Sequence, residues 1–553
     1  MNGAPTARWL GLLFFSMLLI PSAFAQEQKY DFLIRGALVF DGESVKGVQA
    51  DLGIRGDRIA AIGNLAGAAA KKTIEAKGLV LAPGFIDAHT HSDFNPLIYP
   101  KLSNKILQGV TGEVIGNCGM SAAPVTGLHR AKIREIWARE GVKIPAVSWE
   151  SFKEYRKALL SEGLRTNLMG LVGHGNLRSA VLGVSPRKAT KGEIAQMKTM
   201  LSRAMSEGAG GVSFGLIYLP GIFAGKEELV ELCREAGRRG GVCAFHMRSE
   251  GSRLIESIEE VISIGREAGA PVQISHLKAG GKNNWPKIDE AFRRIEKARR
   301  QGLRVTADAY PYTATAVELG VMLPDEIYQR EDRVVFFKDP TQRTALIEKL
   351  KHYYKKRGMN WGTVMIASVE NKKYQKYEGM TILEISRETG KEPEAFLVEI
   401  LAGTRFEVSS FGFSQSQEGV DRVMTRPYVG VGSDSIADGS RKPHPRAFGT
   451  FPKIFSRYFR TQKTLKLGEA IRKMTSLVAD QFGIEGRGRI RSGDFADLVL
   501  FDAGEIRDLS TYERPALLPR GIQWVFVNGR PAVKNGKPTG ERAGRFLSPH
   551  VKL

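Results

Sequence analysis

Short apolar runs alternate with amphipathic segments through the middle of the chain. Segments 190–208 and 252–269 carry apolar residues at helical spacing and end at glycine, as helices often do. Between such segments lie β-branched runs near residues 84–89, 110–116, 167–173, 210–216, 242–248, 272–277, 304–309 and 428–434. Eight such runs separated by helices predict an α/β fold, a (β/α)8 TIM-type barrel over residues 83–484. A doubly wound sheet is the alternative, but no glycine-rich phosphate fingerprint follows the first run.

The spacing of these runs is irregular at one place. About 115 residues separate the seventh run from the eighth, where one helix would be enough. The segment at about 318–410 contains its own helical patterns and the strand-like stretch "TVMIASV". We expect this segment to be an inserted lid over the mouth of the barrel.

Both ends of the chain are rich in strand patterns. Residues 26–82 contain short β-branched runs separated by glycine-containing turns, and residues 485–553 contain similar runs with Asn-Gly turns at 528–529 and 535–536. These two segments predict a small β-domain built from both termini.

The first 25 residues differ from the rest. Arg8 precedes the apolar run "WLGLLFFSMLLI", and Ala23 and Ala25 form an Ala-x-Ala cleavage site. This pattern predicts a secretory signal peptide over residues 1–25 and an exported, periplasmic or secreted protein. A run of 12 apolar residues is short for a membrane span, so we expect no stable membrane insertion after cleavage.

Composition narrows the function classes. The 553 residues carry a net charge of +22, but lysine and arginine are spread along the chain without a basic arm, so we expect no nucleic-acid partner. Three cysteines do not make a disulfide scaffold. Cys233 and Cys243 could form a bridge or remain two buried thiols, which leaves Cys118 without an obvious role.

Metal-ligating residues occur where the predicted strands end. In a barrel, the carboxyl ends of all strands meet at the rim that carries active sites. His89 and His91 alternate along the first strand and would project from one face. The residues placed at this rim are His89, His91, Cys118, His246, His276 and Asp434. Their side chains predict a metal site.

The ligand types favour zinc as the cofactor. Imidazole nitrogen and thiolate sulfur suit Zn²⁺, and three protein ligands plus one water are typical of a catalytic site. Water bound to zinc ionises near neutral pH and becomes a nucleophile. Asp434 could take the proton of that water and pass it to a leaving amine.

Ten stretches of the chain form a pattern in this order: "APGFIDAHTHSD", "GNCG", "GHGNLR", "GVSFGLIYLPG", "FHMRSE", "ISHLK", "YPY", "GSDS", "HPRAFGTFPKI" and "FADLVLFD". Together they resemble the amidohydrolase superfamily, and specifically its N-acyl-D-amino-acid deacylases (D-aminoacylases). The resemblance covers almost the whole chain after the first 25 residues. Most amidohydrolases bridge their metals with a carboxylated lysine, whereas "GNCG" is similar to the branch that uses cysteine.

The resemblance implies roles for individual residues. Cys118, His246 and His276 would hold a tight zinc, and His89 and His91 would form a weaker second site that shares Cys118. Asp434 would be the catalytic acid and base. Tyr218, Lys278 and Arg446 match substrate-contacting positions, the last two as partners of a carboxylate, with Arg441 as a rival to Arg446. Thr315 and Ala316 stand where the family tends to have Gly-Ser, which affects the acyl or side-chain preference.

Three further groups have two interpretations each. His174, also at the rim, would contact substrate or orient a loop through a hydrogen bond. Arg248 and Glu250 are expected beside the ligands rather than among them. "GVSFG" (211–215) fits a serine-nucleophile motif, but we expect its glycines to serve close backbone packing.

These observations lead to one functional hypothesis and its rivals. The expected activity is zinc-dependent hydrolysis of the amide bond of N-acyl-D-amino acids, which releases a carboxylate and a D-amino acid. A cyclic-imide or hydantoin ring hydrolase and a D-peptidase are rivals within the superfamily. A non-catalytic metal-binding envelope protein is the rival of a different class.

Overall fold

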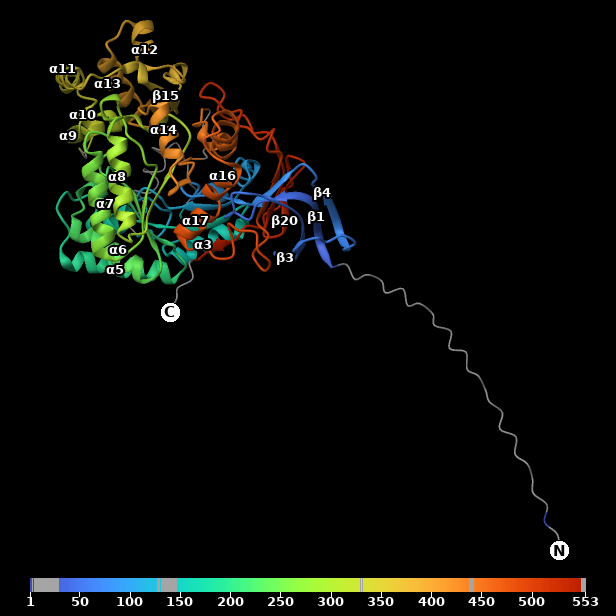
Figure 1. The fold of residues 1–553 in the computed structure, drawn as a ribbon. Helices are drawn as coiled ribbons and strands as arrows, with labels where there is room; N and C mark the ends of the chain where they lie inside the picture. Colours follow the sequence, from blue (N-terminus) through green and yellow to red (C-terminus); the bar gives the residue numbers. More distant parts are fainter. Residues whose placement is uncertain are drawn as a thin grey trace.

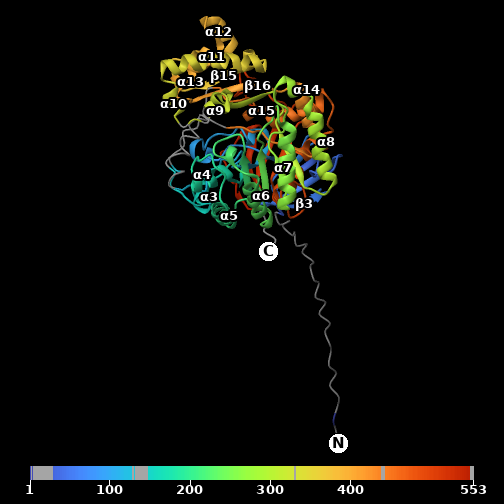
Figure 2. The same ribbon diagram turned by 90° about the vertical axis from the view of Figure 1, so that its left-hand side faces the viewer.

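The computed structural model describes residues 29–126, 147–328, 332–436 and 442–548, with Met1, Gly3, Arg130 and Arg330. Apart from Met1 and Gly3, the expected signal peptide lies outside the described residues, as does Arg441. Figures 1 and 2 show a helix-wrapped central body, a β-sheet against its side and a smaller helical layer over one end. No helix in the described ranges is both long enough and apolar enough to cross a membrane.

Parallel strands form the centre of the body, close to the runs expected from sequence. β17, β13, β12, β11, β10 and β9 follow one another in one sheet, and β8, β7 and β6 in another. The Ala88 amide donates to the Val431 carbonyl at 3.1 Å, which joins the first strand to the last. The strands are β6 (Phe85–Asp87), β7 (Val110–Ile115), β8 (Asn167–Gly170), β9 (Val172–Gly173), β10 (Gly211–Gly215), β11 (Val242–His246), β12 (Val272–Ile274), β13 (Val305–Ala309) and β17 (Val429–Val431).

Helices surround these strands because one face of each is apolar. In α7 the buried positions include Leu254, Ile258 and Val261, which recur at helical spacing. Thr190 and Glu193 form a capping box at the start of α5, which fixes where that helix begins. The helices are α3 (Phe152–Glu162), α4 (His174–Leu182), α5 (Lys191–Ser206), α6 (Lys226–Arg238), α7 (Leu254–Ala268), α8 (Lys287–Arg300), α14 (Gln417–Met424), α15 (Arg446–Lys453), α16 (Leu467–Lys473) and α17 (Ser476–Phe482).

Segments from both ends of the chain share one nine-stranded sheet. Its order is β21-β20-β19-β18-β5-β1-β2-β3, with β4 paired to β1. The C-terminal β18 runs antiparallel to β5, so the two ends of the chain meet in the middle of the sheet. Its strands are β1 (Tyr30–Val39), β2 (Val48–Arg55), β3 (Arg58–Gly63), β4 (Ala70–Glu75), β5 (Val80–Pro83), β18 (Leu498–Phe501), β19 (Ile522–Val527), β20 (Arg530–Lys534) and β21 (Lys537–Pro538).

One strand near the C-terminus joins the central body instead. β22 (Phe546–Leu547) pairs in parallel with β8. Phe546 is buried and packs edge-on against Phe152 of α3 at 5.6 Å between ring centroids. The C-terminal segment therefore contributes strands to the nine-stranded sheet and to the sheet of β6, β7 and β8. The sequence pattern did not predict the second of these contributions.

A subdomain lies between β13 and β17. Its three-stranded sheet has the order β14-β16-β15, and its apolar side chains form a separate core. In Figure 2 its helices form a layer across the top of the central body. Its elements are β14 (Ala314–Glu318), α9 (Asp325–Tyr328), α10 (Arg333–Phe336), α11 (Pro340–Arg357), β15 (Val364–Val369), α12 (Ile382–Thr389), α13 (Pro393–Thr404) and β16 (Val408–Phe413).

Candidate metal centre and adjoining cavity

The expected metal ligands come together at one end of the parallel strands. Cys118, His246 and His276 form one group of potential ligands. His276 Nε2 lies 3.0 Å from His246 Nδ1 and 3.5 Å from Cys118 Sγ. All three residues are buried, so these nitrogen and sulfur atoms face one another away from bulk water.

A second group shares Cys118 with the first. It consists of His89, His91, Cys118 and Asp434, whose ligand atoms lie within 4.8 Å of one another. His89 Nε2 is 3.4 Å from Cys118 Sγ, and Asp434 Oδ1 is 3.4 Å from His89 Nε2 and 3.3 Å from His91 Nε2. Cys118 is thus placed between two sets of histidines.

The "GNCG" loop owes its shape to close backbone packing. Cys118 has a φ of 53°, a conformation that L-residues rarely adopt and that is typical of functional sites. A Cβ on Gly119 would lie 2.4 Å from the Gly215 amide nitrogen, so only glycine fits there. The Ser213 hydroxyl donates to the Gly116 carbonyl at 2.5 Å and accepts from the Gly119 amide at 3.0 Å. The serine of "GVSFG" therefore supports the loop that presents Cys118.

The electrostatics favour the ligand form of Cys118. Burial opposes ionisation of the thiol, but the positive charge of His89 and hydrogen bonds from His246 and His276 hold its pKa well below its usual range. The thiolate is the form of cysteine that binds metals. A buried thiolate among four imidazoles fits a zinc ion, for which sulfur and nitrogen ligands are usual.

Carboxylates behind the histidines orient them. Asp308 Oδ1 lies 3.3 Å from His89 Nδ1 and accepts the His276 amide at 2.8 Å. Glu250 Oε1 is 2.7 Å from His276 Nδ1, beside the ligands as expected. Carboxylates that contact the second ring nitrogen of a ligand fix its orientation. Sequence reasoning missed Asp308, although an acid within the buried strand "VTADA" is a usable signal.

A cavity of about 200 Å³ opens beside the two groups. Its lining combines metal-ligand candidates, residues expected to contact substrate, and apolar side chains. Thr315, Ala316, Val317 and Val321 of the subdomain contribute to its wall. Other lining residues are His91, Cys118, Met120, Ile217, Tyr218, His246, Glu250, His276, Lys278, Tyr310, Asp434, Ile436 and Arg446.

Arg446 connects Asp434 to this cavity. Its Nη1 donates to Asp434 Oδ2 at 2.8 Å, and its guanidinium lies over the Tyr310 ring at 4.7 Å. Burial opposes ionisation of Asp434, but Arg446 and His276 hold its pKa well below its usual range. Arg446 Nε and the Tyr310 hydroxyl have no hydrogen-bond partner among the described residues. Lys278 Nζ donates to Glu250 at 2.6 Å.

Two further histidines, His174 and His444, lie outside the two groups of potential metal ligands. His174 is fully buried and does not line the cavity; its Nε2 lies 2.7 Å from Glu228 Oε1. This position corresponds to the orienting role rather than to substrate contact. His444 was given no role from sequence, yet its Nδ1 accepts the Arg446 amide at 3.1 Å and its Nε2 lies 3.1 Å from the Ala314 carbonyl. His444 thereby ties Arg446 to β14.

Comparison with known proteins identifies the family. Residues 72–320 and 420–533 match the amidohydrolase family. A D-aminoacylase and an N-acyl-D-aspartate deacylase, both from Alcaligenes xylosoxydans xylosoxydans, are 37% and 36% identical. The matches cover 95% of this chain and 99% of the former relative, and 94% of this chain and 95% of the latter.

A solved structure agrees with this assignment. The crystal structure of an N-acyl-D-glutamate deacylase from Bordetella bronchiseptica, in complex with zinc and a phosphonate that mimics the tetrahedral intermediate, is 31% identical, with a TM-score of 0.81 over 94% of this chain and 100% of that one. The chain belongs to the amidohydrolase family, as a metal-dependent amidohydrolase of its D-aminoacylase group.

Proposed function

We propose that this protein hydrolyses the amide bond of N-acyl-D-amino acids. The observation that carries the proposal is the cavity in which Asp434 lies beside two cysteine-linked histidine groups, with Arg446, Tyr310 and Lys278 also in its lining. The N-acyl-D-aspartate and N-acyl-D-glutamate deacylases among its relatives support this substrate class.

The cofactor of the proposed reaction is zinc. Cys118, His246 and His276 would hold the tight ion, and His89, His91 and Cys118 a weaker second one. The zinc in the Bordetella bronchiseptica relative supports this choice of metal. When bound, zinc polarises a carbonyl oxygen and lowers the pKa of a water molecule.

Asp434 is proposed to carry the proton. It is held ionised by Arg446, so it is ready to accept a proton from the attacking water. It then returns this proton to the amide nitrogen as the C–N bond breaks, which releases a carboxylate and a free amino acid. The loop after β17 directs Asp434 toward the cavity, with a φ of 48° at this residue.

The α-carboxylate of the substrate is proposed to bind near Arg446. Arg446 lines the cavity with its guanidinium 4.7 Å from the Tyr310 ring centroid, and Lys278 adds a positive charge 5.9 Å from the same centroid. A planar guanidinium suits a carboxylate. Tyr218, whose ring lies 4.9 Å from that of His246, would contact the substrate on the metal side. Anchoring the carboxylate fixes where the side chain points, and so the preferred configuration.

The proposed side-chain preference is neutral and apolar. Ile217, Val317, Val321 and Ile436 line the cavity. The cations of the described lining, Lys278 and Arg446, are assigned to the α-carboxylate and also pair with Glu250 and Asp434. An acidic side chain would lack a free positive partner in this part of the wall, and burying an unpaired charge is costly.

We also propose how the chain is divided into domains. Residues 26–82 and 485–553 form the β-domain around a barrel over 83–484, and the insertion at about 318–410 acts as a lid. The contribution of Thr315, Val317 and Val321 to the cavity wall supports the lid role. Residues 1–25 would direct export to the periplasm or the medium.

Turnover of a substrate panel tests the proposal. The panel contains N-acetyl-D- and N-acetyl-L-forms of Met, Leu, Asp and Glu, with hydantoin and a D-Ala dipeptide, each assayed with metal-free and zinc-reconstituted protein. We expect zinc-dependent hydrolysis of the D-forms, fastest with Met and Leu. Turnover of hydantoin or the dipeptide alone would instead favour one of the rival activities. Bound zinc without any turnover would contradict the proposal.

A further inference from the structure

A buried lysine lies beneath the candidate metal centre. Lys105 precedes a short 3-10 helix (Ile106–Gln108) between β6 and β7, and only 6% of it is exposed. Its Nζ has five oxygen neighbours from three parts of the chain. They are Asp87 Oδ2 at 2.5 Å, Ser433 Oγ at 2.8 Å, Ser435 Oγ at 2.9 Å, Thr90 Oγ1 at 3.0 Å and Glu113 Oε2 at 3.8 Å.

These partners flank residues of the proposed active site. Ser433 and Ser435 stand on either side of Asp434, and Thr90 stands between His89 and His91. The Asp87 carboxylate also accepts the Ser433 amide at 2.8 Å. The ammonium group therefore fastens the first strand of the ring to the last, at the point where each presents its functional side chains.

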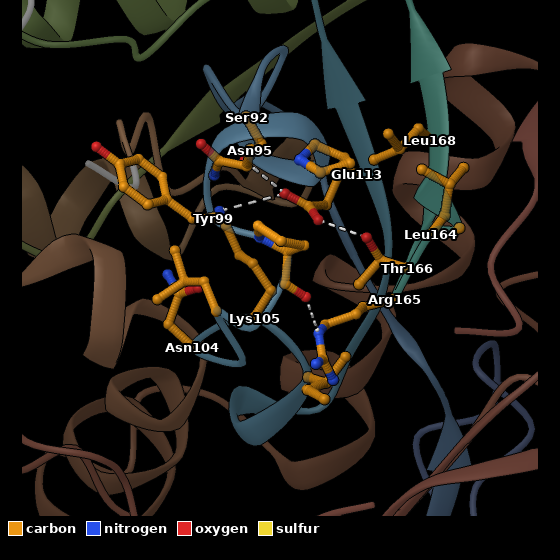
Figure 3. A pocket seen from close by; sticks show the side chains of 15 residues that line it. Ser92, Asn95, Tyr99, Asn104, Lys105, Glu113, Leu164, Arg165, Thr166 and Leu168 are labelled. Atoms are coloured by element: carbon orange, nitrogen blue, oxygen red, sulfur yellow. Dashed lines mark hydrogen bonds and ion pairs between the residues drawn. The ribbon is translucent and has the colours of Figure 1, made fainter. Parts of the chain in front are cut away.

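Glu113 extends the same network to the other side of His91. The Ser92 hydroxyl donates to Glu113 Oε2 at 2.8 Å, and the Thr166 hydroxyl donates to Oε1 at 2.6 Å. Figure 3 shows Glu113 between these two hydroxyls, with Lys105 approaching the same carboxylate, at the edge of a small second cavity of about 50 Å³. Neither Lys105 nor Glu113 lines the cavity beside the metal ligands, so neither would touch substrate.

We propose that Lys105 is a positioning residue that holds the His89–His91 pair and Asp434 in register with each other. It does so through charge-assisted hydrogen bonds to Asp87 and to three hydroxyls, which would separate if the charge were lost. This inference rests on the proposed roles of the two histidines and Asp434. It assigns to Lys105 an effect on both the second metal site and the proton-transfer step.

Two variants of Lys105 separate positioning from folding. In Lys105→Met we expect kcat for N-acetyl-D-methionine to fall about 10–100-fold, as when residues that orient metal ligands are replaced, with KM within about 3-fold of wild type. Zinc titration of metal-free protein should show the second ion bound at least about 10-fold more weakly, and the first ion retained. Lys105→Arg keeps the charge and should recover part of both losses.

Lys473→Met is the matched control. Lys473 is also a buried lysine, 3% exposed, but it donates to the carbonyls of Arg426 and Val429 at the opposite end of β17, the latter at 2.9 Å. We expect its kcat per folded molecule and its second-zinc affinity to match wild type. If Lys105→Met does not fold, Ser435→Ala can be used, because it removes one contact of Lys105. This variant should show smaller losses of kcat and of affinity for the second zinc ion.

These experiments distinguish failure of the Lys105 inference from failure of the proposed function. A Lys105→Met protein whose kcat and second-zinc affinity stay within about 2-fold of wild type would overturn the inference, as would equal losses in Lys473→Met. Failure of the wild type to hydrolyse any N-acyl-D-amino acid would contradict the proposed function. The zinc titrations would still test Lys105 in that case.

Discussion

Arg446 contacts Asp434 and is proposed to bind the substrate carboxylate as well. Its Nη1 donates to Asp434 Oδ2 at 2.8 Å, and the guanidinium also lines the cavity, where the proposed substrate carboxylate would bind. Lysine at this position would keep a positive charge but could not serve both groups with a fixed geometry.

Arg446→Lys is therefore expected to weaken substrate binding. KM for N-acetyl-D-methionine should rise about 10-fold or more, because one charge-assisted hydrogen bond contributes about 1.5–3 kcal/mol. N-acetyl-D-methioninamide lacks the carboxylate and should show a much smaller change in KM. Steady-state kinetics with both compounds checks this, and an equal change for the two would argue against carboxylate recognition by Arg446.

Sequence patterns predicted some residues of the candidate site and missed others. The "HTH" pair, "GNCG" and the histidines at strand ends could be placed at one rim because strand direction alone puts them there. Asp308 and His444 act through contacts with distant residues, such as His276 and Ala314, which no local pattern reveals. Lys105 lies in the ordinary-looking stretch "LSNKILQG", and its role depends on residues 433–435, more than 300 positions away.

At the scale of elements, the inserted subdomain contributes apolar side chains to the wall of the cavity. Val321 lies in a 3-10 helix (Leu319–Met322) directly after β14 and is partly exposed. It lines the cavity from the inserted subdomain, whereas the metal ligands follow strands of the central body. A change there should alter side-chain preference without altering the metal groups.

Val321→Arg is expected to shift the preference toward acidic substrates. The new guanidinium supplies the positive partner that the described wall lacks, so the ratio of kcat/KM for N-acetyl-D-Glu to that for N-acetyl-D-Met should rise about 10-fold or more. Val321→Met is the matched control of similar bulk and should leave the ratio within about 3-fold. An unchanged ratio in the arginine variant would indicate that the side chain binds elsewhere.

A buried ion pair links the nine-stranded sheet to the central strands. Asp497 pairs with Arg487, accepts the Asn528 amide at 2.7 Å, and accepts Asn167 Nδ2 of β8 at 3.0 Å. Asp497 and Arg487 are 3% and 4% exposed. Removal of one partner would leave the other charge buried and unpaired.

Asp497→Ala should lower the free energy of unfolding by about 3–5 kcal/mol, the usual loss when one member of a buried pair is removed. Asp57→Ala is the control, because Asp57 pairs with Arg545 at the surface, where such pairs contribute about 0–1 kcal/mol. Urea unfolding measures both. Similar small losses in the two variants would show that the pair does not hold the sheet to the barrel strands.

The sequence predicted most elements because their periodicity is local. Alternating runs and capped amphipathic segments gave strands and helices within a few residues of those found. The insertion begins with β14 at Ala314, slightly earlier than expected, because this strand pairs with β16 nearly 100 residues later. Pairing of β22 with β8 likewise depends on contacts between distant segments.

At the scale of the whole molecule, stability should depend on pH through Lys473. Burial, with a contribution from Arg472, lowers the pKa of Lys473 to about 7, whereas an unfolded lysine titrates near about 10.4. Between these values the unfolded chain binds more protons than the folded one, so the free energy of unfolding rises with pH. Below about pH 7 both states are protonated and this dependence ends.

The comparison of wild type with Lys473→Met isolates this contribution. From about pH 7 to about pH 10, the free energy of unfolding of wild type minus that of the variant should increase by up to about 1.4 kcal/mol per pH unit. Urea unfolding at several pH values gives the difference. Parallel curves for the two proteins would mean that Lys473 titrates normally in the folded state.

The most direct test of the central claim is turnover of N-acetyl-D-methionine by Asp434→Asn, with zinc quantified in the same samples. Loss of the proton carrier should reduce kcat by about 10²–10⁴-fold, the usual contribution of general acid–base catalysis, while the zinc assigned to Cys118, His246 and His276 stays bound. Activity within a few-fold of wild type in the zinc-loaded variant would contradict the account.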